Sequence, residues 1–240
     1  MHLTNTKPDH LTISVIVPTY NEALNIDTLL DQLEKELSQY DHQIIVVDDS
    51  SPDDTSKIVE RRSACNSRIT LLKRRSKLGL ASAVLDGFHI SHGDLIVMMD
   101  ADLSHQPNQL PNLIAAASNA DIVIGSRYVQ GGSVVNWPYH RKLASKVASS
   151  FARFILGVRI NDPASGFAVF KRNILASFSD VSAPAGFKLT LAVISCNPGA
   201  KIVEVPITFP NRRYGKSKFT PTEIFRFLYL CWKLKTTRTQ

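Results

Sequence analysis

Short apolar runs alternate with longer helical patterns through the first half of the chain. The runs are rich in Val and Ile, which is typical of buried strands, and the segments between them carry apolar residues at helical spacing. Strand–helix–strand alternation predicts a parallel sheet with helices on both faces, whose ligands collect at the carboxyl ends of the strands. The predicted strands are Ile13–Val17, Gln43–Val47, Ile69–Leu72, Leu95–Met99 and Ile122–Ile124, and the predicted helices are Glu22–Gln39, Pro52–Ala64, Leu80–Ser91 and Asn108–Ser118.

The second half of the chain is less regular. Its predicted elements are a helix at Tyr139–Leu156, a Gly- and Pro-marked loop at Asn161–Gly166, a strand at Phe167–Phe170, a helix at Phe187–Cys196, a strand at Lys201–Pro206, a basic loop at Asn211–Lys218 and a final helix at Thr222–Lys235. A chain of 240 residues without an internal repeat suits one α/β domain. We expect a polar extension at 1–12, the domain at 13–218, and an amphipathic helix with a tail at 219–240.

Charge is distributed unevenly between the two halves. Residues 1–126 hold 10 Lys and Arg against 17 Asp and Glu, a balance of −7, whereas residues 127–240 hold 18 against 4, a balance of +14. An acidic half suited to a cation is therefore followed by a basic half suited to phosphate groups. Nucleic-acid binding is the competing interpretation of the basic half, but no nucleic-acid-binding motif accompanies it, and we expect no such partner.

Cysteine usage and hydropathy indicate the compartment. Cys65, Cys196 and Cys231 are an odd, scattered set, which favours neither a disulfide framework nor a zinc site. The polar opening segment predicts no signal peptide, and no apolar run reaches the length of about 18 residues that a membrane span needs. A cytoplasmic setting is expected.

Polar clusters follow the first two predicted strands. After the first strand, Tyr20 could stack on a base and Glu22 could contact the ribose or the base; a simple turn with Asn21 as the helix N-cap is the alternative. After the second strand, Ser51-Pro52 and Asp54 match an N-cap with a capping-box-like spacing. Capping does not explain Asp48 and Asp49, since adjacent carboxylates repel each other without a partner.

The cluster after the fourth predicted strand is the most informative. Asp100 and Asp102 end a fully apolar run and are separated by the small Ala101, which leaves room for a ligand. Positions i and i+2 of an extended chain project to the same side. Converging carboxylate oxygens suit Mg²⁺ or Mn²⁺ bound together with a diphosphate, although a solvated turn is the alternative.

Nine ordered stretches of the chain resemble family 2 glycosyltransferases of the GT-A (Rossmann-like) fold, most of all the dolichol- or polyprenol-phosphate mannose synthases. They occur in order from residue 17 to residue 219, along nearly the whole chain, which makes the resemblance specific. The stretches are VPTYNE (17–22), VVDDSSPDDT (46–55), LGLASAVLDGF (78–88), MDADLSHQP (99–107), GSRYVQGG (125–132), NWPYHRKLASK (136–146), DPASGF (162–167), GFKL (186–189) and RRYGKSKF (212–219).

The resemblance implies a role for individual residues. Asp102 and Arg127 are expected to act in catalysis. The residues expected to bind the donor nucleotide-sugar are Pro18, Tyr20, Glu22, Val47, Asp49, Asp100, Ala101, Lys188 and Lys218. The implied metal ligands are Asp100, Asp102 and Ser104, and the implied acceptor-phosphate ligands are Arg127, Arg141, Ser145 and Arg212. The sequence departs from the family pattern at Ala192, where a Glu is common.

The final predicted helix is mostly apolar, with Phe225, Phe227, Tyr229 and Trp232 between basic residues. It is too short to cross a bilayer but suits the membrane interface. Packing against the core or a partner is the alternative. A peripheral position at the cytoplasmic face, through the membrane surface or a membrane-anchored subunit, is therefore expected.

The resemblance implies an inverting transfer of a sugar, with GDP-mannose as the expected donor, onto a polyprenyl or dolichyl monophosphate. Two alternatives remain: a UDP-sugar such as UDP-glucose as the donor, and a non-catalytic protein that binds the nucleotide or the lipid phosphate. A nucleotidyltransferase of similar fold should have a Gly-rich loop after the first strand, and VPTYNE contains none.

Overall fold

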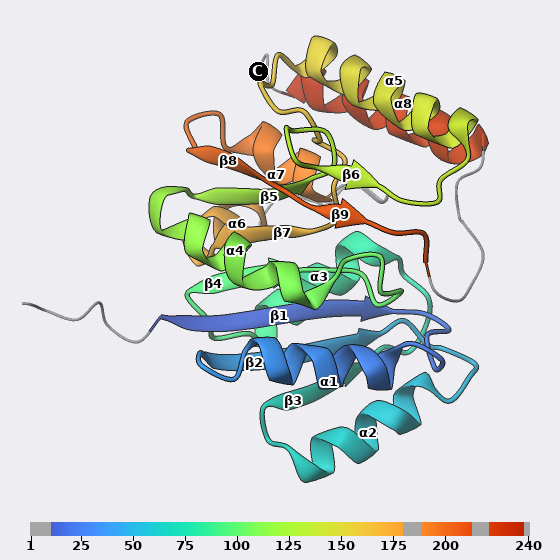
Figure 1. Cartoon of the computed structure of the whole chain (residues 1–240), viewed down its shortest axis with the longest axis vertical. Coiled ribbons are helices and arrows are strands. Elements are labelled where there is room, and N and C mark those ends of the chain that lie inside the picture. Colours follow the sequence, from blue (N-terminus) through green and yellow to red (C-terminus); the bar gives the residue numbers. More distant parts are fainter. Residues whose placement is uncertain (1–10, 180–188, 213–220, 238–240) are drawn as a thin grey trace, which may run out of the picture.

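The computed structural model describes residues 11–179, 189–212 and 221–237. A seven-stranded sheet in the order β3-β2-β1-β4-β7-β5-β8 forms its centre (Figure 1). Its strands are β1 (Thr12–Thr19), β2 (Asp41–Asp48), β3 (Ile69–Lys73), β4 (Leu95–Met98), β5 (Ile122–Ser126), β7 (Ala168–Lys171) and β8 (Ile202–Pro206). Two short strands, β6 (Ser133–Val134) and β9 (Thr208–Phe209), form a separate parallel pair.

The helices that surround the sheet are α1 (Ile26–Glu36), α2 (Thr55–Cys65), α3 (Leu80–Ile90), α4 (Leu110–Ala116), α5 (Tyr139–Leu156), α6 (Arg172–Ser179), α7 (Leu189–Cys196) and α8 (Pro221–Thr237). Short 3₁₀ turns flank α4 at Pro107–Gln109 and Ala117–Asn119. None of these helices, within the residues described, combines the length and the apolar character that crossing a bilayer demands.

The sheet confirms the predicted parallel architecture. Every neighbouring pair within it is parallel except the two that involve β7, which runs antiparallel to both β4 and β5. The sequence predicted the strand but not its direction. Neither α6 nor the small β6–β9 sheet was predicted.

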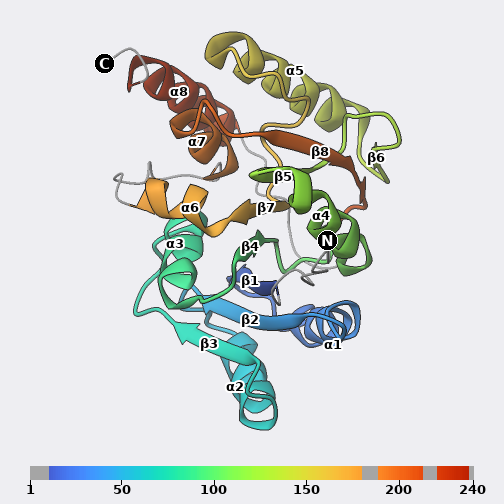
Figure 2. The same ribbon diagram turned by 90° about the vertical axis from the view of Figure 1, so that its left-hand side faces the viewer.

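Alternate residues of the buried strands pack into opposite layers. Val15 and Val17 belong to a core with α1 and α4, whereas Ile16 belongs to a second core with α3, α6 and α7. Figure 2 shows α1 and α4 on one side of the sheet and α3 and α6 on the other. The apolar strand runs are buried on both faces, as a parallel sheet requires.

Helix α8 has two kinds of face. Leu230, Cys231 and Leu234 are buried in the core that α5 also joins, and α5 and α8 lie side by side in Figures 1 and 2. Tyr229 and Trp232 are exposed. The packing and interface interpretations of the final helix therefore concern different faces of the same helix.

The predicted starts of the first two helices were wrong. α1 begins at Ile26 after Asn25, because Asn21 adopts a left-handed φ of 61° and the Glu22 carbonyl accepts the N–H groups of Asn25 and Ile26. α2 begins at Thr55 after Asp54, and Ser51 does not cap it. The Ser51 hydroxyl donates instead to Asp48 Oδ1, at 2.6 Å, and accepts the N–H of Asn21.

Asp48 explains why Ser51 is not a cap. Its fully buried carboxylate accepts the hydroxyls of Thr19, Ser51 and Ser56 and the N–H of Ser51, at 2.6–3.1 Å. These donors come from the end of β1, the loop after β2 and the start of α2. Asp48 therefore stabilises the carboxyl edge of the sheet rather than serving a ligand.

We predict that Asp48→Ala lowers the free energy of unfolding by about 3 kcal/mol, because several buried donors lose their acceptor at once. Asp41, at the opposite and exposed end of β2, is the matched control, and Asp41→Ala should leave the denaturation midpoint unchanged. Urea unfolding followed by circular dichroism measures both. A loss below about 1 kcal/mol for Asp48→Ala would contradict this assignment.

Candidate active site

The predicted site residues gather at the carboxyl ends of β1, β2 and β4. These three parallel strands are neighbours in the sheet, so the segments that follow them meet at one edge. In Figure 1 their arrowheads point to the same side of the molecule. The segment after β5 and the start of α5 also lie on that side.

Asp49 holds the loop between β3 and α3. Its Oδ1 and Oδ2 atoms each accept a main-chain N–H at 2.8 Å, from Leu78 and Gly79, and Arg74 Nη1 lies 3.0 Å from Oδ1. Arg74 is buried and also donates to the Gly79 carbonyl and to Ser82. Sequence reasoning missed Arg74, since its only signal was a charged residue directly after a strand.

The residues at the end of β1 lie beside this loop. Tyr20 is half-buried, and Lys77 Nζ lies 3.4 Å from the centroid of its ring. Glu22 accepts a hydrogen bond from Asn25 Nδ2 at 2.8 Å. Lys77 was not among the predicted site residues, although it places a cation over the ring that is expected to stack on the base.

Two of the predicted donor-binding residues have apolar side chains that are buried in the core. Val47, which pairs with Pro18 in the β1–β2 register, lies in the core, and so does Ala101. Any contact of Val47 or Ala101 with a donor must therefore use the main chain. The methyl group of Ala101 packs into the core, and the expectation that this small residue leaves room beside a ligand stays a prediction.

Asp100 and Asp102 occupy the turn after β4. Asp102 is nearly buried: its Oδ1 accepts the Ser104 N–H at 3.0 Å, and its Oδ2 lies 3.5 Å from Arg212 Nη2. The Asp100 carboxylate is more exposed. Ser104 is buried.

His105 closes the same turn. Its Nδ1 accepts the main-chain N–H of Asp100 at 2.8 Å, and its ring stacks on Phe167. Burial lowers the pKa of His105, although the carboxylates of Asp100 and Asp102 oppose this effect. Sequence reasoning passed over this residue in favour of Ser104.

The arginines expected at the acceptor phosphate differ in their partners. The Nε and Nη2 atoms of Arg127 each donate to Asp162 at 2.7 Å, and its main-chain N–H adds a third bond to that carboxylate. Both side chains are buried, at 9% and 0% exposure. Burial alone would lower the pKa of Arg127, but the Asp162 carboxylate outweighs it and raises that pKa.

Arg141 lies among other cations. Its guanidinium is 3.8 Å from the ring centroid of Trp137, and Nη1 donates to Asn211 at 3.1 Å. Burial, and then the charges of Arg212 and Arg127, lower the pKa of Arg141. Ser145, one turn further along α5, accepts the hydroxyl of Tyr128 at 2.7 Å. Three arginines therefore act on one region beside Asp102.

The acidic turn fits a divalent cation that takes further ligands from a substrate. Among the described residues, no three His, Cys, Asp or Glu side chains gather as a complete metal cage. Asp100 and Asp102 offer hard carboxylate oxygens, which suit Mg²⁺ or Mn²⁺ with additional oxygens from a diphosphate.

Lys188 and Lys218 lie outside the described residues. Position 192 is a buried alanine of α7, so it offers no carboxylate.

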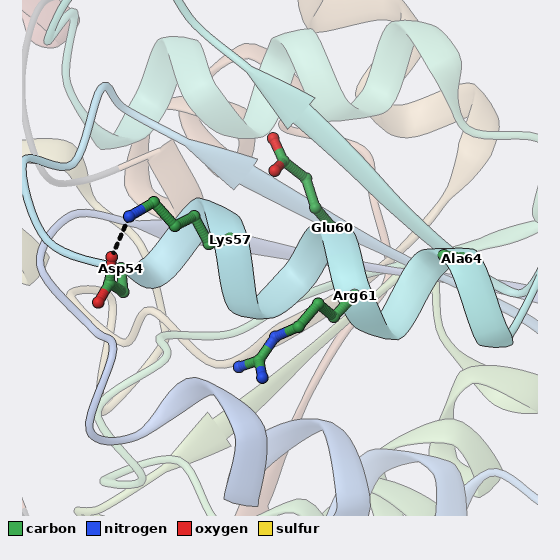
Figure 3. A pocket seen from close by; sticks show the side chains of 5 residues that line it. All are labelled: Asp54, Lys57, Glu60, Arg61 and Ala64. Carbon is green, nitrogen blue, oxygen red and sulfur yellow. Dashed lines mark hydrogen bonds and ion pairs between the residues drawn. The ribbon is translucent and has the colours of Figure 1, made fainter.

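A separate open depression of about 650 Å³ lies on the outer side of α2 and is lined by Asp54, Lys57, Glu60, Arg61 and Ala64 (Figure 3). Its side chains are all exposed, and none of them belongs to the predicted site.

The fold defines a class of protein. The structure aligns with that of glucosyl-3-phosphoglycerate synthase from Mycobacterium tuberculosis, solved in complex with Mn²⁺, UDP and glucosyl-3-phosphoglycerate. The TM-score is 0.68 at 20% identity, and the match covers 95% of this chain and 79% of that one. The mostly parallel sheet with its acidic turn after β4 thus has the GT-A fold.

The chain belongs to glycosyl transferase family 2, whose model matches residues 14–178. It is 41% identical over 225 residues to a dolichol-phosphate mannosyltransferase of Pyrococcus furiosus, covering 92% of this chain and 63% of that protein. It is 39% identical over 214 residues to an undecaprenyl-phosphate mannosyltransferase of Micrococcus luteus, covering 87% of each. The chain thus spans less than two thirds of the archaeal relative.

We predict that Asp162→Ala lowers the free energy of unfolding by about 3–5 kcal/mol, because it leaves the buried Arg127 guanidinium without its counter-charge. The exposed Asp54–Lys57 ion pair is the matched control, and Asp54→Ala should not measurably shift the unfolding midpoint. Urea titration of both variants provides the comparison. Equal stabilities would show that Asp162 does not anchor Arg127.

Proposed function

We propose that this chain is a metal-dependent, inverting glycosyltransferase that moves mannose from GDP-mannose to a polyprenyl or dolichyl monophosphate. The names of the relatives at about 40% identity support the sugar and the acceptor class. The resemblance of the motifs to mannose synthases supports the nucleotide.

The arginine cluster beside Asp102 is the observation that carries the proposal. Burial and two neighbouring arginines lower the pKa of Arg141, and Arg212 Nη2 lies 3.5 Å from Asp102 Oδ2. Crowded, partly buried cations are unfavourable unless an anion joins them. A phosphate monoester beside the acidic turn supplies that anion, and forked guanidinium groups match its oxygens.

Arg127 and Arg141 have different roles in this proposal. Asp162 holds Arg127 rigidly and compensates its charge, so Arg127 gives the site a fixed shape and adds little net charge. Arg141 and Arg212 contact the acceptor phosphate, and Ser145 adds a hydroxyl. The acceptor needs no general base, because a phosphate monoester with a second pKa of about 6 is largely dianionic at neutral pH.

The donor lies on the opposite, acidic side of the site. Tyr20 stacks on the base, Lys77 adds a positive charge nearby, and Asp49 fixes the loop that carries Lys77. Asp100 and Asp102 would hold Mg²⁺ or Mn²⁺, and the ion would supply positive charge that stabilises the departing diphosphate. The chain's own task is to align the acceptor phosphate with the anomeric carbon, on the face opposite the diphosphate.

A donor panel tests the proposal. GDP-mannose and UDP-glucose are each assayed with a short, soluble polyprenyl phosphate, with Mg²⁺, with Mn²⁺ and with a chelator. We expect metal-dependent release of GDP, with formation of a mannosyl phosphate lipid. Preference for UDP-glucose would make the UDP-sugar alternative correct, and donor binding without release of nucleotide would make the protein a binder.

In the same assay, we predict that Arg141→Ala lowers kcat/KM for the acceptor. The corresponding activation free energy should rise by about 2–4 kcal/mol, because a desolvated charged contact to phosphate is lost. Titration calorimetry should give an unchanged affinity for GDP. Lys142→Ala, which removes the exposed neighbouring charge on α5, is the control and should retain activity. Weakened GDP binding with unchanged acceptor kinetics would assign Arg141 to the donor.

We further propose that the α5–α8 layer contacts the membrane that contains the lipid acceptor. An apolar stripe runs along α5 at helical spacing: Tyr139, Leu143, Val147 and Phe154, with exposures of 80%, 51%, 59% and 85%. Tyr229 and Trp232 of α8 are exposed as well. Aromatic and aliphatic side chains in this pattern suit the interfacial region of a bilayer.

Charge favours a lipid surface as the occupant. Lys142, Lys146 and Arg153 of α5 and Lys233 and Lys235 of α8 are exposed among these apolar residues. Each such cation adds roughly 1 kcal/mol of attraction to an anionic leaflet. Arg141 and Ser145 face inward from the same helix, as their contacts with Asn211 and Tyr128 require. Helix α5 could then contact lipid on one face and the acceptor phosphate on the other, in a peripheral position at the cytoplasmic face.

We predict that the intact chain floats with anionic liposomes, and that Val147→Ser with Phe154→Ser reduces the bound fraction by about tenfold, since two apolar side chains no longer enter the bilayer. Leu24→Ser, at an exposed apolar residue before α1, is the matched control and should bind as the unmodified chain does. If the intact chain ignores both anionic and neutral liposomes, direct membrane contact is wrong and a membrane-anchored partner subunit becomes the better proposal.

A further inference from the structure

His105 lies where the turn after β4 returns toward the core. The turn carries Asp100 and Asp102, and Leu103 within it adopts a left-handed φ of 61°. Residues other than glycine rarely adopt a left-handed φ, because it brings their Cβ atom close to the main chain. The turn therefore needs contacts that offset its strain.

Hydrogen bonds hold the turn near both of its ends. The Ser104 N–H donates to Asp102 Oδ1 at 3.0 Å, and the Asp100 N–H donates to His105 Nδ1 at 2.8 Å. An accepting ring nitrogen carries no proton, so His105 is the neutral tautomer with its proton on Nε2. The imidazole therefore anchors the main chain of Asp100 without competing for its carboxylate.

The ring of His105 is itself fixed. It is 2% exposed, stacks on Phe167 with 5.1 Å between centroids, and meets the edge of Phe209 at 5.3 Å. Gly166 completes the enclosure. A Cβ atom on Gly166 would lie 3.2 Å from His105 Cε1 and 3.5 Å from Asp100 Oδ2, so a larger residue would crowd both groups.

We infer that His105 is a positioning residue that holds the Asp100–Asp102 turn in the geometry that a divalent cation requires. The inference rests on the proposed function, because it takes these two carboxylates as cation ligands. The Asp100 and Asp102 carboxylates, with one residue between them, repel each other, so a loose turn would let them move apart. If the turn is already ordered, cation binding carries no additional free-energy cost for ordering it.

Three substitutions separate the hydrogen bond from the packing. In His105→Asn, the side-chain Oδ1 can take the place of Nδ1 as the acceptor. In His105→Gln, the amide reaches instead toward the position of Nε2. His105→Phe keeps a flat ring between Phe167 and Phe209 but has no acceptor.

The readout is Mn²⁺ affinity, measured on the full chain by titration calorimetry in the presence of GDP. We expect His105→Phe and His105→Gln to weaken Mn²⁺ binding at least tenfold, in the range typical of residues that orient metal ligands, and His105→Asn to stay within about threefold. Asp102→Asn, which removes a proposed ligand, is the reference for loss of the site. Thermal unfolding and circular dichroism of each variant confirm that the chain is folded.

Activity provides a second measurement. In the Phe and Gln variants, the Mn²⁺ concentration for half-maximal turnover should rise, excess Mn²⁺ should restore most of kcat, and the KM of the acceptor should stay constant. Variants that unfold earlier but bind Mn²⁺ normally would overturn the inference, because His105 would then serve only the core. Asn as impaired as Phe would also overturn it. If the unmodified chain binds no Mn²⁺ with GDP or UDP, the proposed metal-dependent function fails as well.

Discussion

Three carboxylates at the carboxyl edge of the sheet, those of Asp48, Asp49 and Asp102, are each held by hydrogen-bond donors. Asp48 takes hydroxyls from β1 and α2, Asp49 takes main-chain N–H groups from the loop before α3, and Asp102 takes the N–H of its own turn. Parallel strands bring these like charges together, so the edge requires such donors. The two loops and the turn that surround the site depend on these bonds.

The basic side of the site follows a different rule. Arg127 has a buried counter-charge in Asp162, and the main-chain N–H of Asp162 in turn donates to Glu204 Oε1 at 2.9 Å. Within the described part of the chain, the short contacts of Arg141 are with neutral groups, an indole ring and an amide oxygen. Compensated and crowded arginines side by side give a region that is rigid and still attracts an anion. That combination suits the phosphate acceptor proposed above.

Local patterns predicted the strands and most helices because burial on both faces leaves a clear apolar signature. Predictions failed where a side chain had two possible partners. Ser51 has the right residue type and spacing for an N-cap, yet a buried carboxylate three residues earlier binds its hydroxyl instead. The direction of β7 has no local signature, because antiparallel and parallel strands with both faces buried carry the same apolar run.

Short-range periodicity was enough to predict most strands and helices along the chain and to place Asp100 and Asp102 after an apolar strand. Which polar groups meet depends on the packed layers. Arg127 finds Asp162 across 35 residues, and Leu78 and Gly79 reach Asp49 across about 30. His105 contacts the main chain of Asp100 because Phe167 and Phe209, distant in sequence, fix its ring. Such pairings depend on side-chain directions that exist only after the layers have packed.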